Sequence, residues 1–325
     1  MPGGMTRRGL VPLLLAAAAF ADEAKPLPLA RSVILPSGGT YFVEGRQEIS
    51  WGQELSVQKG TRISGRGAGA TLVVSGALQV RGIDGAHVAI DGLVIEVAER
   101  CERVHLETVD LAGCAIRTPA GKACEARVHL EEVALEDSPV ELRLTKGEIT
   151  ILNSRTKGAV TLAGVPEAGK TRAVVKALVN CCNVDRDFHA EGIPSLVVRG
   201  CGIYGNTVVF KDCEELAFDA NVVKAPSIVF EQSKPGGFRK TMLQKSDFHG
   251  VQLIFKVPRE DKATDRIPVD KCWFQGRTKK DEILGKDIKD GHTDETTGAF
   301  VVFRKINERE LKLGGMTTQG NGLSR

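Results

Sequence analysis

The stretch CERVHLETVDL (Cys101–Leu111) returns as CEARVHLEEVAL (Cys124–Leu135) and, more altered, as CEELAFDANVV (Cys213–Val223). Each copy places similar residues at positions i, i+2, i+5 and i+7. In the first copy these positions hold Val104, Leu106, Val109 and Leu111. Two period-two alternations separated by a bend are typical of two short consecutive strands.

The same spacing recurs along the chain, about nine times in all, with a variable period near twenty residues. Further copies begin at Val88, Ile149, Ala177, Leu196, Leu216, Thr241 and Ile267. A third strand is indicated after each pair, as at Val140 and Leu142 after the second copy. Glycines recur at the turn after the second strand, where we expect positive φ angles, which glycine adopts at little cost. They are Gly205, Gly250 and Gly276.

Three short strands per repeat predict an all-β fold, a right-handed parallel β-helix of about nine to eleven turns. One turn cannot bury its apolar side chains alone, whereas stacked turns share one continuous core. Two interior columns are expected. The first holds Cys182, Cys201, Asn221, Ser246 and Cys272, and its apolar neighbour holds Val184, Ile203, Val223, Phe248 and Phe274.

Two other folds fit the sequence less well. A leucine-rich repeat has a similar period, but leucine does not dominate here and the second half of each repeat resembles a strand. A flat β-sandwich would require hairpin signals such as Asn-Gly between strands, and these are scarce.

The repeats, together with the N-terminal stretches LPSGGTYFVEG and LSVQKGTRISGRGAGATLVVSG, resemble the pectin-lyase-like, right-handed parallel β-helix superfamily. The glycines Gly65, Gly67 and Gly69 before the strand Thr71–Val74 are similar to the opening turns of exported members. The resemblance covers roughly residues 32–275 and extends to a strand at Val301–Phe303. At the level of the fold it implies carbohydrate-active enzymes, adhesins and structural spikes.

The catalytic motifs of the superfamily do not carry over to this chain. Polygalacturonase-like members use Asn-Thr-Asp, Asp-Asp, Gly-His-Gly and Arg-Ile-Lys runs, which are missing here. The stretch DFHGV (Asp247–Val251) contains His-Gly without the preceding glycine. Pectate-lyase-like members bind calcium with clustered aspartates, and no matching cluster is found at the corresponding positions.

The composition and the N-terminal residues indicate where the protein is located and which classes of partner to expect. The apolar run VPLLLAAAAF follows the basic MTRRGL and precedes an AFA cleavage motif, so residues 1–21 are expected to be a signal peptide of an exported protein. An uncleaved anchor is the alternative. We expect one β-helix domain over 22–313 and a flexible tail over 314–325. The net charge is +3 with mixed signs, so nucleic acid is not an expected partner; nor is a later membrane-spanning segment expected.

The main candidate site is an outward-facing stripe just after the second strand, formed by Asp185, Tyr204, Lys224 and His249. Asp187, His189 and Arg199 lie near it in the sequence. Asp185, Asp187, His189 and His249 are the candidate acids and bases for cleaving a glycosidic bond. Tyr204, Arg199 and Lys224 are the candidate sugar-binding residues. The alternative is a mixed, solvated surface.

Two weaker candidates concern metals. Alternation turns His105 and His129 outward on adjacent turns, each near Glu107 or Glu131, which could bind a transition metal or be solvated copies of one duplicated motif. The loop 285–298 gathers oxygen ligands that calcium could use. They are Asp287, Asp290, Asp294 and Glu295, with His292 among them. No cofactor is expected beyond this possible calcium.

The eight cysteines are interpreted by position. Cys182, Cys201 and Cys272 are expected inside as small apolar residues, and Cys181 outside. Cys101 and Cys124 precede the same strand in adjacent turns, so a disulfide and two free thiols are equally open.

Two functions compete, and a scaffold without a ligand is a third possibility. The first is an exported, non-catalytic module that binds glycans or extracellular partners. The second is a polysaccharide lyase or glycoside hydrolase acting in a groove along the helix. The sequence favours the first slightly and leaves the ligand and the oligomeric state open.

Overall fold

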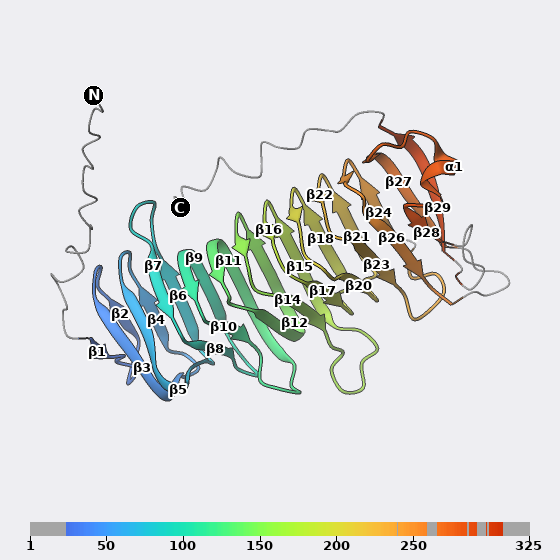
Figure 1. Ribbon diagram of the computed structural model, residues 1–325. Helices are drawn as coiled ribbons and strands as arrows, with labels where there is room; N and C mark the ends of the chain where they lie inside the picture. Colours follow the sequence, from blue (N-terminus) through green and yellow to red (C-terminus); the bar gives the residue numbers. More distant parts are fainter. Residues whose placement is uncertain are drawn as a thin grey trace, which may run out of the picture.

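The computed structural model describes residues 24–238, 240–258, 265–284, 286–290, 297 and 299–307. They form a parallel β-solenoid of about ten turns, which confirms the predicted all-β, coil-upon-coil fold (Figure 1). Every pairing between its named strands is parallel, with each strand bonded to the equivalent strand one coil away. The expected signal peptide and C-terminal tail lie outside the described residues, as do the ends of the predicted domain.

The first face of the solenoid carries the first strand of each repeat. Its strands are β2 (Val33–Leu35), β4 (Glu54–Val57), β6 (Ala77–Arg81), β9 (Arg103–Ala112), β11 (Cys124–Glu136), the end of β12 (Val140–Leu152), β15 (Val174–Asn180), β18 (Ser195–Arg199), β21 (Glu215–Asp219), β24 (Lys240–Gln244), β27 (Asp265–Phe274) and β29 (Ala299–Ile306).

The second face carries the second strand of each repeat. Its strands are β1 (Lys25–Pro26), the starts of β3 (Thr40–Ile49) and β5 (Arg62–Val74), β7 (Val88–Asp91), the ends of β9 and β11, β13 (Arg155–Thr156), β16 (Asn183–Val184), β19 (Gly202–Ile203), β22 (Val222–Val223), β25 (Asp247–Phe248) and the end of β27.

The third face completes each coil. Its strands are the ends of β3 and β5, β8 (Val94–Val97), β10 (Ala115–Arg117), the start of β12, β14 (Val160–Gly164), β17 (Phe188–Glu191), β20 (Val208–Lys211), β23 (Ser227–Glu231), β26 (Gln252–Lys256) and β28 (Ile288–Lys289). One four-residue helix, α1 (Lys280–Ile283), occurs in the described chain, and none there is long and apolar enough to cross a membrane.

The echoed sequences stack as predicted, because Val104 pairs with Val128 and Leu111 with Leu135. Both expected interior columns form and are buried. Phe210, Phe230 and Phe255 stack ring on ring, with neighbouring centroids 5.4 and 4.9 Å apart. The core is therefore one continuous stack of like residues along the solenoid axis.

One repeat was assigned to the wrong strands. Val88 and Ile90 pair with Val109 and Leu111, on the second face, whereas the predicted copy placed them on the first. Leu93 and Ile95, predicted as its second strand, lie at the start of the third face. The spacing i, i+2, i+5 and i+7 joins second to third strands as well as first to second, so it cannot by itself fix the phase.

The bend between the first and second faces uses a left-handed residue at the same place in eight successive coils. These residues are Thr108, Glu132, Asn153, Cys181, Gly200, Ala220, Lys245 and Lys271, with φ between 47° and 63°. Gly250 and Gly276 have the expected positive φ. Gly205 does not have a positive φ. Glycine is required there because a Cβ atom would lie 1.9 Å from the Arg186 carbonyl oxygen.

Candidate functional site

The predicted stripe after the second strand forms in register. Asp185, Tyr204, Lys224 and His249 each follow a paired residue of the second face, so they occupy equivalent positions in four consecutive coils. Asp185 forms an ion pair with Arg155 at 3.1 Å. The Lys224 ammonium lies 5.8 Å from the Tyr204 ring centroid. Burial, and then the charge of Asp185, raise the pKa of Tyr204.

The remaining residues assigned to this site lie elsewhere. Asp187 accepts the backbone N–H of Thr207 at 2.9 Å and so fixes a turn. His189 is on β17 of the third face, with its Nε2 atom 3.8 Å from Glu191. Arg199 is on β18 of the first face, paired with Asp219 at 3.3 Å. The acids and bases considered for glycosidic cleavage are thus divided between two faces of the solenoid.

His105 and His129 do stack on adjacent coils, with ring centroids 4.7 Å apart. His129 Nε2 lies 3.1 Å from Glu131, and His105 Nε2 lies 3.8 Å from Glu107. Burial, and then the neighbouring His129, lower the pKa of His105. Among the residues that the structure describes, no three His, Cys, Asp or Glu side chains are placed to hold one metal ion.

The acidic loop is only partly described. Asp287 forms an ion pair with Arg277, and burial raises its pKa. Asp290 is buried and accepts the backbone N–H of Val301 at 2.7 Å. His292, Asp294 and Glu295 lie outside the described residues. Both described aspartates therefore have protein partners.

The eight cysteines are all free thiols, so Cys101 and Cys124 are not bridged. Seven are buried, including the three expected inside, and Cys181 is half-buried, as its outward assignment predicted. Burial raises the pKa of Cys101 and of Cys124 to about 12.

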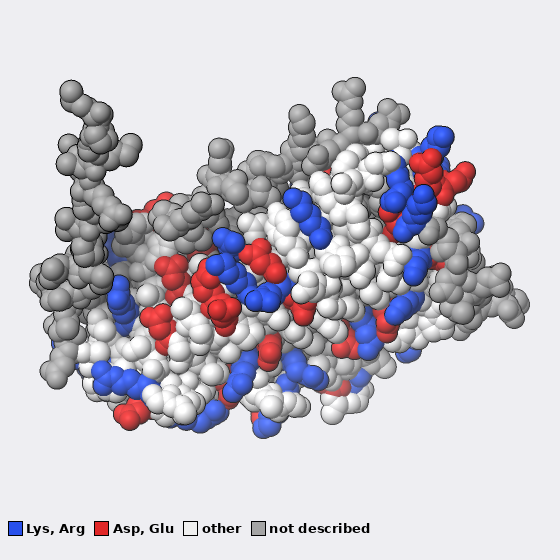
Figure 2. Space-filling model, viewed as in Figure 1, with Lys and Arg blue, Asp and Glu red and all other residues white. Residues whose placement is uncertain are grey.

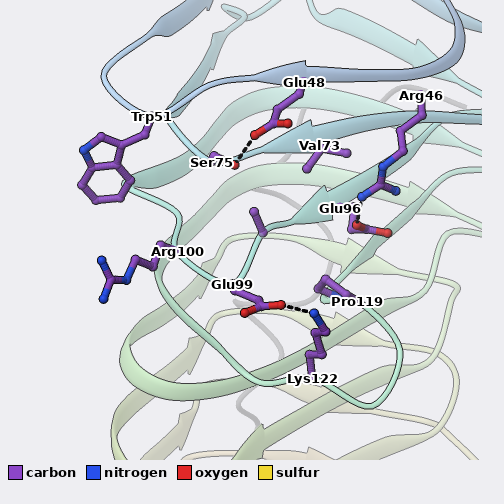
Figure 3. A pocket seen from close by; sticks show the side chains of 11 residues that line it. Arg46, Glu48, Trp51, Val73, Ser75, Glu96, Glu99, Arg100, Pro119 and Lys122 are labelled. Atoms are coloured by element: carbon purple, nitrogen blue, oxygen red, sulfur yellow. Dashed lines mark hydrogen bonds and ion pairs between the residues drawn. The ribbon is translucent and has the colours of Figure 1, made fainter.

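One hollow of the structure was not anticipated from the sequence. It has a volume of about 690 Å³ and lies where the third face turns into the next coil's first face. We call it the Trp51 hollow, and its lining includes Arg46, Trp51, Val73, Glu96, Arg100 and Lys122. Figure 3 shows Trp51 and Arg100 on the same side of it, with the Glu99–Lys122 pair closing another side. The Trp51 side chain is 63% exposed.

The turn that presents Trp51 is fixed by hydrogen bonds. Gln53 donates its N–H to the Ser50 carbonyl at 3.0 Å, and Gly52 donates its N–H to the Glu102 carboxylate at 2.8 Å. Gly52 has a φ of 77°, which glycine adopts without strain. An exposed indole on a fixed turn loses little conformational freedom on binding a flat ligand.

A second hollow, of about 340 Å³, adjoins the first and shares Trp51 and Arg100 with it. We call it the Arg127 hollow; its lining also includes Glu102, Glu125, Arg127 and Lys146. The two hollows therefore meet at one aromatic residue and one guanidinium.

In these two hollows the carboxylates have partners within the protein, whereas two of the arginines do not form ion pairs with described residues. Their carboxylates all have partners: Glu96 with Arg46, Glu99 with Lys122, Glu125 with Lys146, Glu48 with Ser75 and Glu102 with Gly52. Arg100 and Arg127 are exposed, and neither forms an ion pair with another described residue. Among the described residues that line these hollows, the charged groups without a partner are therefore positive.

Sequence reasoning missed this site because its parts are distant in sequence and outside the repeat. The available signal was that Trp51 is one of only two tryptophans and stands in a short polar turn, SWGQ. Comparison of the chain with protein-family models, curated proteins and solved structures finds no significant match.

Proposed function

We propose that the protein is an exported, non-catalytic module that binds acidic glycans at the paired Trp51 and Arg127 hollows. The observation that carries this proposal is that the exposed Trp51 and the Arg100 guanidinium, which has no ion-pair partner among the described residues, both line the two hollows. An exposed aromatic ring on a rigid turn suits the flat, C–H-rich face of a pyranose. The resemblance of the repeats to pectin-lyase-like proteins, which include glycan-binding members, supports the same class of ligand.

The charge balance favours an acidic over a neutral glycan. Guanidinium groups bind carboxylates and sulfates through paired, charge-assisted hydrogen bonds. Arg100 and Arg127 are available for such bonds, while the carboxylates of the hollows are held by cations, Ser75 or a backbone N–H. Figure 2 shows acids and bases intermixed on the face drawn, so the preference is a local one and not a field of the whole molecule.

Binding is favoured over hydrolysis because the carboxylates of the Trp51 hollow are engaged in the protein. Glu96 is largely buried and accepts from Arg46 at 2.7 Å, and Glu48 accepts the Ser75 hydroxyl at 2.6 Å. Hydrolysis of a glycosidic bond requires one carboxyl group to donate a proton while another acts on the opposite side. Carboxylates paired in this way are suited to shaping the hollow.

Binding is tested with Trp51 as its own reporter. Trp273→Phe leaves Trp51 as the only tryptophan, and its fluorescence is titrated with polygalacturonate, alginate and neutral dextran. We expect a saturable change with the acidic polymers and a much smaller one with dextran. Trp51→Ala should weaken binding about tenfold or more, measured by calorimetry, as for an aromatic hot spot.

The matched control is Trp273→Ala, because Trp273 packs against His249 on another face, with ring centroids 5.0 Å apart. It should leave the affinity unchanged. Equal loss in both tryptophan variants, or no binding of any acidic polymer by the wild-type protein, would refute the proposal.

A further inference from the structure

A third hollow, of about 730 Å³, lies farther along the same edge of the solenoid. We call it the Lys234 hollow. It lies between the loop 165–173, which joins β14 to β15, and the turn 232–238, which follows β23. Its lining includes Arg143, Arg172, Glu191, Asp212, Glu214 and Lys234. Figure 1 shows such loops projecting from one long edge of the solenoid.

The three hollows follow one another along this edge. β12 contributes to two of them, Lys146 to the Arg127 hollow and Arg143 to the Lys234 hollow. Trp51 follows β3, and Gly236 follows β23, which is eight coils farther along the third face. Eight spacings of about 4.8 Å span about 38 Å.

The Lys234 hollow repeats the charge pattern of the other two. Its carboxylates have partners: Glu191 with Lys211 at 2.7 Å, Glu214 with Arg172 at 3.1 Å, and Asp212 with the Ser233 hydroxyl at 2.7 Å. Arg143 and Lys234 are exposed, and within the described chain neither forms an ion pair. Open positive charge thus recurs at both ends of the edge.

We propose that one linear acidic glycan lies along this edge, with the Trp51 hollow as its primary subsite and the Lys234 hollow as a remote subsite. This inference rests on the proposed function and adds that the ligand is a polymer long enough to reach both hollows. A chain already held at Trp51 meets the remote cations at a high effective concentration, so modest contacts there add to the affinity. A short oligomer reaches only the primary subsite.

The test is a size series of oligogalacturonates, from the dimer to chains longer than the edge, titrated calorimetrically. With the wild-type protein, affinity should rise with chain length and level off once a chain reaches both hollows. The double variant Arg143→Ala, Lys234→Ala should bind the long chains about tenfold more weakly and the short ones unchanged. Trp51→Ala should weaken binding of every length.

The double variant Lys59→Ala, Arg62→Ala is the matched control, since it removes one exposed lysine and one exposed arginine at the bend between the first and second faces, away from the edge. Circular dichroism checks that each variant is folded. The remote subsite is refuted, and the primary one stands, in either of two cases. In the first, oligogalacturonates bind and Trp51→Ala weakens them, but the affinity does not rise with chain length. In the second, the double variant Arg143→Ala, Lys234→Ala binds long chains as tightly as the wild-type protein does. If no length binds the wild-type protein, both proposals fail.

Discussion

The side-chain carbonyl oxygen of Asn221 accepts the backbone N–H of Cys201, 2.9 Å away in the preceding coil, and its amide nitrogen donates to the Val198 carbonyl at 3.0 Å. Asn221 is fully buried. The Ser246 hydroxyl in turn accepts the N–H of Asn221 at 3.1 Å. Small polar side chains of this interior column therefore satisfy backbone groups at the bend, which no strand partner bonds.

Asn221→Ala should destabilise the protein by about 2 to 4 kcal/mol, because it leaves the buried N–H of Cys201 without its acceptor and removes a donor to the Val198 carbonyl. Urea unfolding followed by circular dichroism measures the change. Asn180→Ala, at a half-buried outward position on β15, is the control and should cost far less. Equal midpoints for the two variants would contradict the assigned role.

Alkylation of the folded protein should modify one cysteine, Cys181, which is the only half-buried one of the eight. Burial shields the others, and it raises the pKa of Cys213 and of Cys272 to about 12, so little reactive thiolate forms at neutral pH. Mass spectrometry should find one iodoacetamide adduct in the native state and eight after denaturation. Cys181→Ser should remove the native adduct; a disulfide-linked pair would contradict the assignment.

Acidification should destabilise the fold through His105. Burial and the adjacent His129 lower the pKa of His105, so the folded state binds fewer protons than the unfolded one. Its contribution is fully present above the unfolded pKa of about 6.5 and is lost as the pH falls below that value and through the lowered pKa of the folded state. Glu107 attracts the protonated ring, whereas Arg81 and Arg103 repel it, and these effects are smaller than burial.

His105→Gln should therefore flatten the loss of unfolding free energy between pH 8 and pH 5, measured by urea titrations. Thr150→Gln changes the same outer column beside His129 without removing an imidazole, and it should keep the wild-type pH dependence. A His105→Gln protein as acid-sensitive as the wild type would show that other groups control the effect.

Two glycines should respond differently to substitution. Gly205→Ala places a Cβ against the Arg186 carbonyl, so the backbone must move, at a cost of about 1 to 3 kcal/mol. Gly250→Asn should cost less: its φ of 68° strains a side chain, but asparagine tolerates this conformation better than most residues, and no atom lies closer than 3.7 Å to the added Cβ. Thermal unfolding compares them, and a Gly250→Asn variant less stable than Gly205→Ala would refute the distinction.

The echoed letters were sufficient to predict the stacking because burial forces apolar residues of adjacent coils into register. Val104 over Val128 and Phe248 over Phe274 follow directly. The sequence could not show on which face Val88 lies, because the bend between the first and second strands and the bend between the second and third give the same apolar spacing. The stripe from Asp185 to His249 was predictable for the same reason as the core, since it lies one residue beyond an interior column.

Trp51 itself stood out in the sequence, but the shape of its hollow could not be predicted, because the turns between the third and first faces differ from coil to coil. Its shape depends on Gly52 meeting Glu102, fifty residues away, and on which carboxylates find cations. Likewise, Asp187 and His189 follow Asp185 closely in the chain, yet a turn carries His189 onto another face. Their closeness to Asp185 in the sequence therefore did not place Asp187 and His189 in the same site.

The left-handed residue found in each of eight successive coils, from Thr108 to Lys271, also bears on how this molecule can change in size. Each coil begins and ends with the same backbone geometry, so duplication of a whole coil inserts cleanly between its neighbours. The identical RVHLE segments that begin at Arg103 and Arg127 have the form of such an event. The solenoid can therefore lengthen by whole coils, and each added coil extends its axis by about 4.8 Å.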